Sequence, residues 1–204
     1  MSPANPMPKI LESPLRQLLP TQLTVGMIEV RDKAKNLKAL APKAQQEFLA
    51  AHPMPVVLGP AGKRYIVDHH HLGRAAFDAG IETAFFTTEG DLSKLTAVGF
   101  WQEMERNLWV HPLDEHGVRH HYAAIPTDLR KLVDDVYRSL AAYVRNAGGY
   151  DKSDAPFAEF RWADFFRRMI AIEDVTANFN VAVETGIPLA HSQLAADLPG
   201  YRKK

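Results

Sequence analysis

One short segment gathers the side chains best suited to chemistry, Asp68-His69-His70-His71. It follows the apolar run 65–67 and precedes the stretch 72–79, which has helical spacing and ends at Gly80, so it is predicted to be a turn between a strand and a helix. An Asp before a helix can accept a backbone N–H bond as a cap. The N–H groups and dipole of a helix start also favour an anion. The residue types and order therefore predict a phosphate-binding turn.

The three histidines cannot all face one ligand, because neighbouring residues of a helix point about 100° apart. We expect His70 and His71 to donate hydrogen bonds to phosphate oxygens, with His69 as a further contact and Arg74 supplying positive charge one helical turn later. Asp68, His70 and His71 are also candidate catalytic residues, and Asp68 and His70 are the candidate ligands of a divalent metal. The alternative is a structural role, with Asp68 as a cap in either case. Partly exposed histidines at a helix start should cost the fold less than about 1 kcal/mol when truncated.

Glu29 and Lys33 are secondary candidates on a predicted helix. Glu29 is a candidate catalytic base or magnesium ligand, and Lys33 a candidate partner of phosphate. A solvated, charged helix face explains the same pattern.

Two further polar groups have mainly structural explanations. The turn around Asp114 and His116, with His111 before it, could add ligands to a zinc site, but its Gly and charged residues are typical of a loop. Asp134, Asp135 and Arg138 have the spacing of a salt-bridged face on one helix.

The remaining pattern predicts an α/β (α+β) protein. Two apolar runs, 54–58 and 65–67, flank a Gly-Pro turn and predict a hairpin whose second strand leads to Asp68. Further strands are expected between residues 15 and 30 and over 82–88, and helices over 31–40, 43–51, 92–108, 129–145 and 157–172. We expect a flexible N-terminal arm over 1–14, a small mixed-sheet core over 15–147 and a C-terminal helical extension over 148–204.

Composition excludes several classes of protein. The 204 residues carry 24 basic and 24 acidic side chains, so the net charge of +0 gives no long-range attraction to nucleic acid. There is no cysteine, which excludes disulfides, thiolate metal sites and cysteine nucleophiles within the chain. No apolar run approaches the roughly 20 residues of a membrane span. The Pro-rich start lacks the pattern of a signal peptide, so we expect a cytoplasmic protein without membrane contacts.

The segment Tyr65–Ala76, YIVDHHHLGRAA, resembles the Asp-Gly-His-His-Arg-x-x-Ala-Ala signature of the ParB/sulfiredoxin superfamily. The chain as a whole resembles the putative ParB-like nuclease family. The supporting stretches are LPTQLTVG at Leu19–Gly26, FWQEM at Phe100–Met104, DDVYRSL at Asp134–Leu140 and EFRWA at Glu159–Ala163. This resemblance implies a ParB/sulfiredoxin-like core that binds a nucleotide of the ATP or CTP type or a small phosphorylated ligand, with Mg²⁺ as a possible companion.

Three departures from the superfamily pattern bear on activity. His69 stands where the motif usually has Gly, and Leu72 where it has a phosphate-binding Arg, which Arg74 could replace. Gln22 stands near the position of a catalytic Glu in the serine kinases, and glutamine cannot act as a general base. The resemblance thus leaves three alternatives: nucleotide or phosphate binding with phosphotransfer or phosphohydrolysis, a metal-dependent nuclease acting on nucleic acid, and a non-catalytic binding or regulatory module.

Overall fold

The computed structural model describes residues 9–203, which form two compact units. The first unit takes in the chain up to Leu23, then Val30–Pro112 and His120–Leu132. The second contains Thr24–Glu29, Leu113–Arg119 and Val133–Lys204. The chain thus enters the second unit for the last time after residue 132, whereas the sequence predicted a boundary at 147/148.

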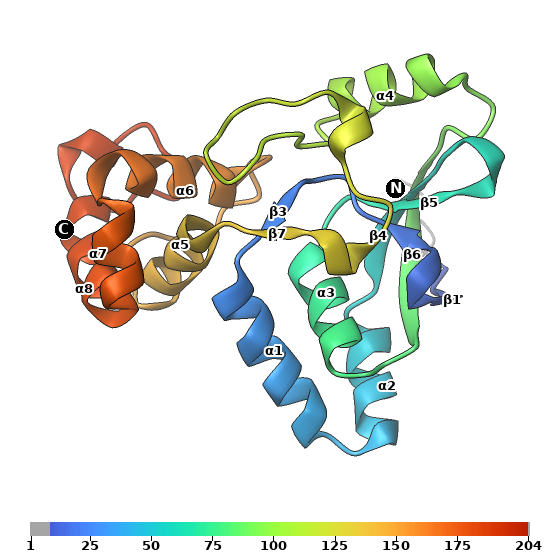
Figure 1. Cartoon of the computed structure of the whole chain (residues 1–204), viewed down its shortest axis with the longest axis horizontal. Coiled ribbons are helices and arrows are strands. Elements are labelled where there is room, and N and C mark those ends of the chain that lie inside the picture. The colour runs from blue at the N-terminus through green and yellow to red at the C-terminus, as the bar shows by residue number, and fades with distance from the viewer. Residues whose placement is uncertain (1–8, 204) are drawn as a thin grey trace, which may run out of the picture. The chain divides into compact units, whose positions relative to one another are not determined.

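A five-stranded mixed sheet forms the centre of the first unit, in the order β1-β6-β4-β5-β2 (Figure 1). The strands are β1 (Leu11–Pro14), β2 (Leu18–Leu19), β4 (Met54–Leu58), β5 (Arg64–Ile66) and β6 (Thr83–Asp91). β4 and β5 are antiparallel, with Val56 opposite Ile66, which confirms the predicted hairpin. β4 and β6 are parallel, so the chain must cross over between them, and α3 makes part of that crossover.

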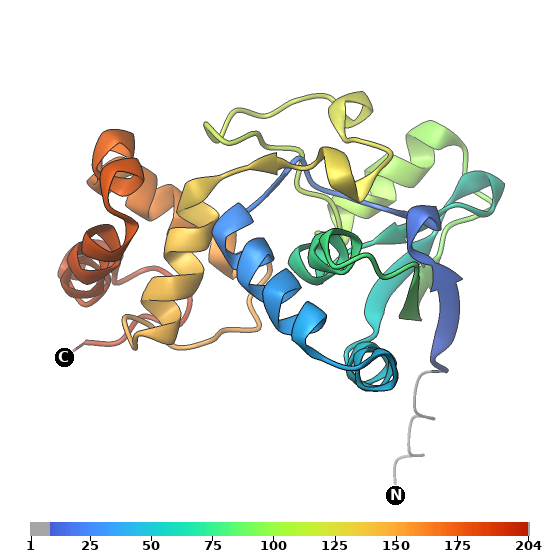
Figure 2. The ribbon, with the colours of Figure 1, turned by 60° about the horizontal axis from the view of Figure 1, so that its bottom comes forward.

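β1 corrects the expectation of a flexible arm over 1–14. Residues 11–14 pair antiparallel with β6, Leu11 opposite Phe86, and Figure 2 shows β1 beside β6 at one edge of the sheet. The backbone pairing and the burial of Ser13 hold the segment in place despite Pro14, which is tolerated because it ends an edge strand. Residues 1–8 lie outside the described part of the chain.

Helices cover both faces of this sheet. The helices of this unit are α1 (Met27–Ala39, whose first turn belongs to the second unit), α2 (Pro42–Ala51), α3 (His70–Asp78) and α4 (Ala97–Arg106). On one face Met54 of β4 lies next to Gly73 of α3. On the other face Val57 packs with Phe100 and Met104 of α4. Val56 and Val57 are therefore both fully buried, as expected of a central strand.

The second unit is mostly helical. It contains α5 (Val136–Asn146), α6 (Ala158–Met169), α7 (Ile172–Ala177) and α8 (Phe179–Ala190), together with a short parallel pair of strands, β3 (Thr24–Val25) and β7 (Val133–Asp134). Its core is centred on the fully buried Trp162, whose ring stacks on Tyr150. None of the helices in residues 9–203 is long and apolar enough to cross a membrane.

The predicted helix over 129–145 is wrong over residues 129–135. Residues Leu129–Lys131 form a 3-10 turn (η4) and Val133–Asp134 form β7 before α5 begins at Val136. The Asp134-Asp135 pair explains the difference, because Asp favours positions before a helix over positions within one.

Candidate functional site

The predicted turn lies between β5 and α3, where the sequence placed it. His69 is the N-cap of α3 and has left-handed backbone angles, φ 62° and ψ 23°. The side chain of His69 makes no capping hydrogen bond to α3, and the first turn of α3 holds no acidic residue. A left-handed residue followed by helical residues makes successive N–H groups converge, and such a concavity binds anions. The backbone thus has the geometry of an anion site.

The expected cap of α3 by Asp68 is wrong. Asp68 lies one residue too far from the helix and is exposed, and its Oδ1 accepts a 2.6 Å bond from the N–H of His69. The left-handed conformation of His69 separates this carboxylate from the first helical turn. Asp68 instead places a negative charge at the edge of the turn.

His70 is buried, with 4% of its surface exposed, although a partly exposed ring was expected. Its Nε2 lies 3.1 Å from the backbone N of Thr21. Because that N–H can only donate, Nε2 is the acceptor, and a neutral ring then carries its proton on Nδ1. Nε2 of His70 therefore cannot donate to a phosphate in this arrangement. His71 is also buried, and Nδ1 of His69 has no hydrogen-bond partner within residues 9–203.

Arg74 is engaged in structural contacts. Its Nε bonds Asp78 at 3.1 Å, and its Nη1 bonds the carbonyl oxygens of Arg130 at 2.9 Å and Leu132 at 3.3 Å. The replacement of the missing motif Arg by Arg74 stays a prediction, and it would require the side chain to give up these bonds.

The other two candidates, Glu29 and Lys33, both lie on α1. Lys33 lies in the part of α1 that belongs to the first unit, and Glu29 lies in the first turn of α1, which belongs to the second. Glu29 interacts there with the charge of Arg138. The roles proposed for both residues stay predictions.

Thr21 contacts the turn, although the sequence patterns did not identify it as a candidate. It is buried, its N–H meets His70, and its Oγ1 donates to the carbonyl of Ile66 at 2.9 Å. Residue types could not predict this role of Thr21, because its backbone N–H makes the contact with His70, which lies 49 positions away in the sequence.

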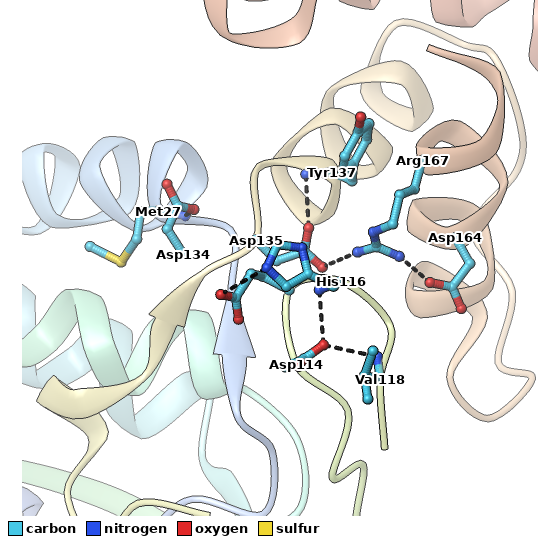
Figure 3. Close-up of polar contacts among 10 residues, drawn as sticks. Met27, Asp114, His116, Val118, Asp134, Asp135, Tyr137, Asp164 and Arg167 are labelled. Atoms are coloured by element: carbon cyan, nitrogen blue, oxygen red, sulfur yellow. Dashed lines mark hydrogen bonds and ion pairs between the residues drawn. The ribbon is translucent and has the colours of Figure 1, made fainter. Parts of the chain in front are cut away.

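A second polar cluster lies at the start of α5 (Figure 3). Asp135 is 3% exposed and caps α5 by accepting from the N–H of Tyr137 at 3.1 Å. Its other oxygen accepts a 2.6 Å bond from Arg167 of α6, which also bonds Asp164. Burial raises the pKa of Asp135, and Arg167 and Arg138 act in the opposite direction. This cluster is an internal charge network.

The predicted salt-bridged face of Asp134, Asp135 and Arg138 is therefore corrected. Asp134 lies in β7 and accepts from the N–H of Met27 at 2.8 Å, while Asp135 pairs with Arg167 (Figure 3). Arg138 is 4% exposed and its guanidinium lies 3.5 Å from the centre of the Phe160 ring. Burial lowers the pKa of Arg138, opposed by the nearby carboxylates.

The loop around Asp114 behaves as a turn. Asp114 Oδ1 accepts from the N–H groups of His116 and Val118, at 2.9 Å and 2.8 Å (Figure 3). Within residues 9–203 no group of three or more His, Asp or Glu side chains is arranged to hold a metal ion.

Comparisons with known proteins identify the family to which this chain is similar. The model of the family described as putative ParB-like nuclease matches residues 11–168. No curated protein matches the chain. The crystal structure of protein Atu1540 from Agrobacterium tumefaciens is 36% identical, covers 97% of this chain and 100% of its own, and has a TM-score of 0.89.

A second solved structure is much less similar. The C-terminally truncated chromosome-partitioning protein ParB from Caulobacter crescentus, complexed with CTP-gamma-S, is 13% identical over 87% of this chain and 92% of its own, with a TM-score of 0.33. The family model covers most of the chain, from β1 into α6. The chain therefore belongs to the putative ParB-like nuclease family.

Proposed function

We propose that this protein binds the phosphate of a nucleotide, of the ATP or CTP type, or of a small phosphorylated ligand, at the start of α3. The observation that carries the proposal is the left-handed conformation of His69 at the N-cap of α3, where the His69 side chain makes no capping hydrogen bond. The converging N–H groups and the helix dipole would together hold the anion.

The start of α6 shows why local charge matters. Its N-cap, Phe157, has nearly the same backbone angles, φ 57° and ψ 24°, and no side-chain cap either. However, the first turn of α6 contains Glu159, whereas the first turn of α3 has no acidic residue. A carboxylate in the first turn already supplies the negative charge that the dipole favours, so α3 is the better anion site.

A metal held by the protein at this turn fits the structure poorly. Of the two expected ligands, His70 turns Nε2 to Thr21 and Asp68 turns its carboxylate to His69. The metal-dependent nuclease is therefore the less favoured alternative, and no step is derived through a metal. A Mg²⁺ that arrives with a nucleotide would need few protein ligands.

The position of Asp68 provides a sharp test of phosphate binding. Asn at this position can still accept from the N–H of His69, but it removes a charge that repels phosphate. Two like charges about 4 Å apart repel by about 1 kcal/mol in water, so Asp68→Asn should bind inorganic phosphate or CTP roughly 5-fold more tightly. A metal-ligand or catalytic role for Asp68 predicts the opposite, a loss.

The measurement is titration followed by backbone amide NMR shifts, with the shifts expected at residues 69–72. Asp91→Asn is the matched control, because Asp91 is also an exposed Asp of the first unit that accepts a backbone N–H, from Ser93 at 3.0 Å. The absence of ligand-dependent shifts at residues 69–72 would refute the proposal.

Turnover separates the remaining alternatives. Release of phosphate from ATP or CTP would establish phosphohydrolysis, and cleavage of plasmid DNA that requires Mg²⁺ would establish the nuclease. Binding without either reaction would identify a non-catalytic module, which the Leu72 and Gln22 departures favour.

A further inference from the structure

Thr21 connects α3 to two other segments of the first unit. Its N–H contacts His70 in the first turn of α3, as described above, and its carbonyl accepts from the N–H of His111 at 2.9 Å. Gln22 and His111 also form an isolated parallel bridge. The segments around residues 21 and 111 are thus tied to each other and to the start of α3.

The middle and second half of α3 hold a third segment, η4 and the residue after it. Arg74 binds the carbonyls of Arg130 and Leu132, and the Arg130 guanidinium lies 5.4 Å from the centre of the Phe77 ring. A Cβ on Gly73 would come within 3.1 Å of Leu129, so this contact is close. One face of α3 therefore anchors residues 129–132.

These anchored segments lead directly into the second unit. The chain passes from Leu23 into Thr24 of β3 and from Leu132 into Val133 of β7. β3 and β7 pair with each other in parallel, Thr24 opposite Val133, and the N–H of Asp135 bonds the carbonyl of Val25 at 2.9 Å. The two strands that follow the anchored segments thus form one hydrogen-bonded pair.

We propose that α3 is a relay that couples its own N-terminal turn to the β3–β7 pair, through Thr21 at its first turn and Arg74 at its middle. The proposal rests on the proposed function for the nature of the signal, which is phosphate arriving at the turn. A shift of α3 along its axis changes both anchors together, and each anchor lies within three residues of the paired strands. Ligand binding at the turn therefore alters the stability of the β3–β7 pairing.

Hydrogen exchange of the full chain, followed by mass spectrometry, tests the relay without ligand. Arg74→Gln removes the guanidinium bonds to Arg130 and Leu132, so amides of residues 129–135 should exchange roughly 5- to 10-fold faster than in the wild type. Arg106→Gln is the control, because Arg106 is exposed and pairs only with Glu103 among its described contacts. Equal exchange in all three proteins would overturn the relay.

The ligand arm uses inorganic phosphate and CTP as probes. In the wild type the ligand should change exchange at residues 24–25 and 133–135. In Phe77→Leu, which removes the ring that the Arg130 guanidinium contacts, the change at 133–135 should be smaller while the amide shifts at residues 69–72 persist. Shifts at the turn with no effect on the strands would overturn the coupling but leave the proposed function intact. If no amide shifts appear at the turn, both the proposed function and phosphate as the signal are overturned. The exchange measured without ligand would still test whether α3 is connected to the β3–β7 pair.

If Arg74→Gln does not fold, Arg74→Lys replaces it. Lysine keeps the positive charge but cannot bond Asp78 and both carbonyls at once, so a smaller increase in exchange over the same residues is expected. A Lys variant identical to the wild type would count against the relay.

Discussion

The starts of α3 and α5 each follow an Asp, yet the two helices begin in opposite ways. Asp135 directly precedes Val136, so it is the N-cap and its carboxylate bonds the helix and Arg167. Asp68 is one residue further from its helix, with the left-handed His69 between them. A difference of one position makes one Asp part of a closed charge network and leaves the other outside the N-cap position of its helix.

The comparison shows that clustered polar residues have different meanings in the two units. At α5, carboxylates and guanidinium groups neutralise each other in the protein interior, and such networks stabilise or specify a fold. At α3, His70 and Arg74 bind other segments of the first unit, and the ligand is proposed to bind the backbone of the turn. Our predictions test this contrast, beginning with the largest effect.

Arg167→Met should destabilise the protein by about 3–5 kcal/mol, because it leaves Asp135 charged and buried without its partner. The loss should be largest at neutral pH. Burial already raises the pKa of Asp135, and a carboxyl with a raised pKa in the folded state takes up its proton there first, so the penalty shrinks as pH falls through that pKa. Urea unfolding at several pH values measures both effects.

Asp164→Asn is the control, because it removes the more exposed partner of the same guanidinium and should cost no more than about 1 kcal/mol. Equal losses of stability in Arg167→Met and Asp164→Asn would show that the contact of Arg167 with Asp135 contributes no more than its contact with Asp164. Neither variant should change the affinity for phosphate.

His70→Ala should cost about 2–4 kcal/mol, more than the sequence suggested for a partly exposed ring. It leaves the buried N–H of Thr21 without its acceptor and creates a cavity. His70→Gln should recover part of the loss, because its side-chain oxygen can reach the position of Nε2. Thermal and urea unfolding provide the comparison, and an Ala variant as stable as the wild type would show that the contact with Thr21 contributes little.

Sequence patterns predicted the elements around the turn well because their signals are local. The Gly-Pro turn between apolar runs determined the β4–β5 hairpin, and Gly80 marked the end of α3. β1 was missed because its order comes from pairing with β6, some 70 residues away. The contacts of His70 with Thr21, of Arg74 with Arg130 and of Asp135 with Arg167 could not be predicted for the same reason, since each partner is distant in the sequence.

The smallest predicted effect concerns His69, which departs from the superfamily motif described above. The motif usually has Gly there, and the left-handed backbone of His69 is the conformation that Gly adopts without strain. His69→Gly should therefore stabilise the protein by about 0.5–1 kcal/mol, after the extra chain entropy of Gly is subtracted. His69→Ala keeps the Cβ and should give no such gain. If the backbone alone binds phosphate, His69→Gly should leave the affinity unchanged in the amide titration. A clear drop in affinity at equal or higher stability would mean that the imidazole contacts the ligand, and the contrast between backbone and side-chain roles at α3 would then have to be redrawn.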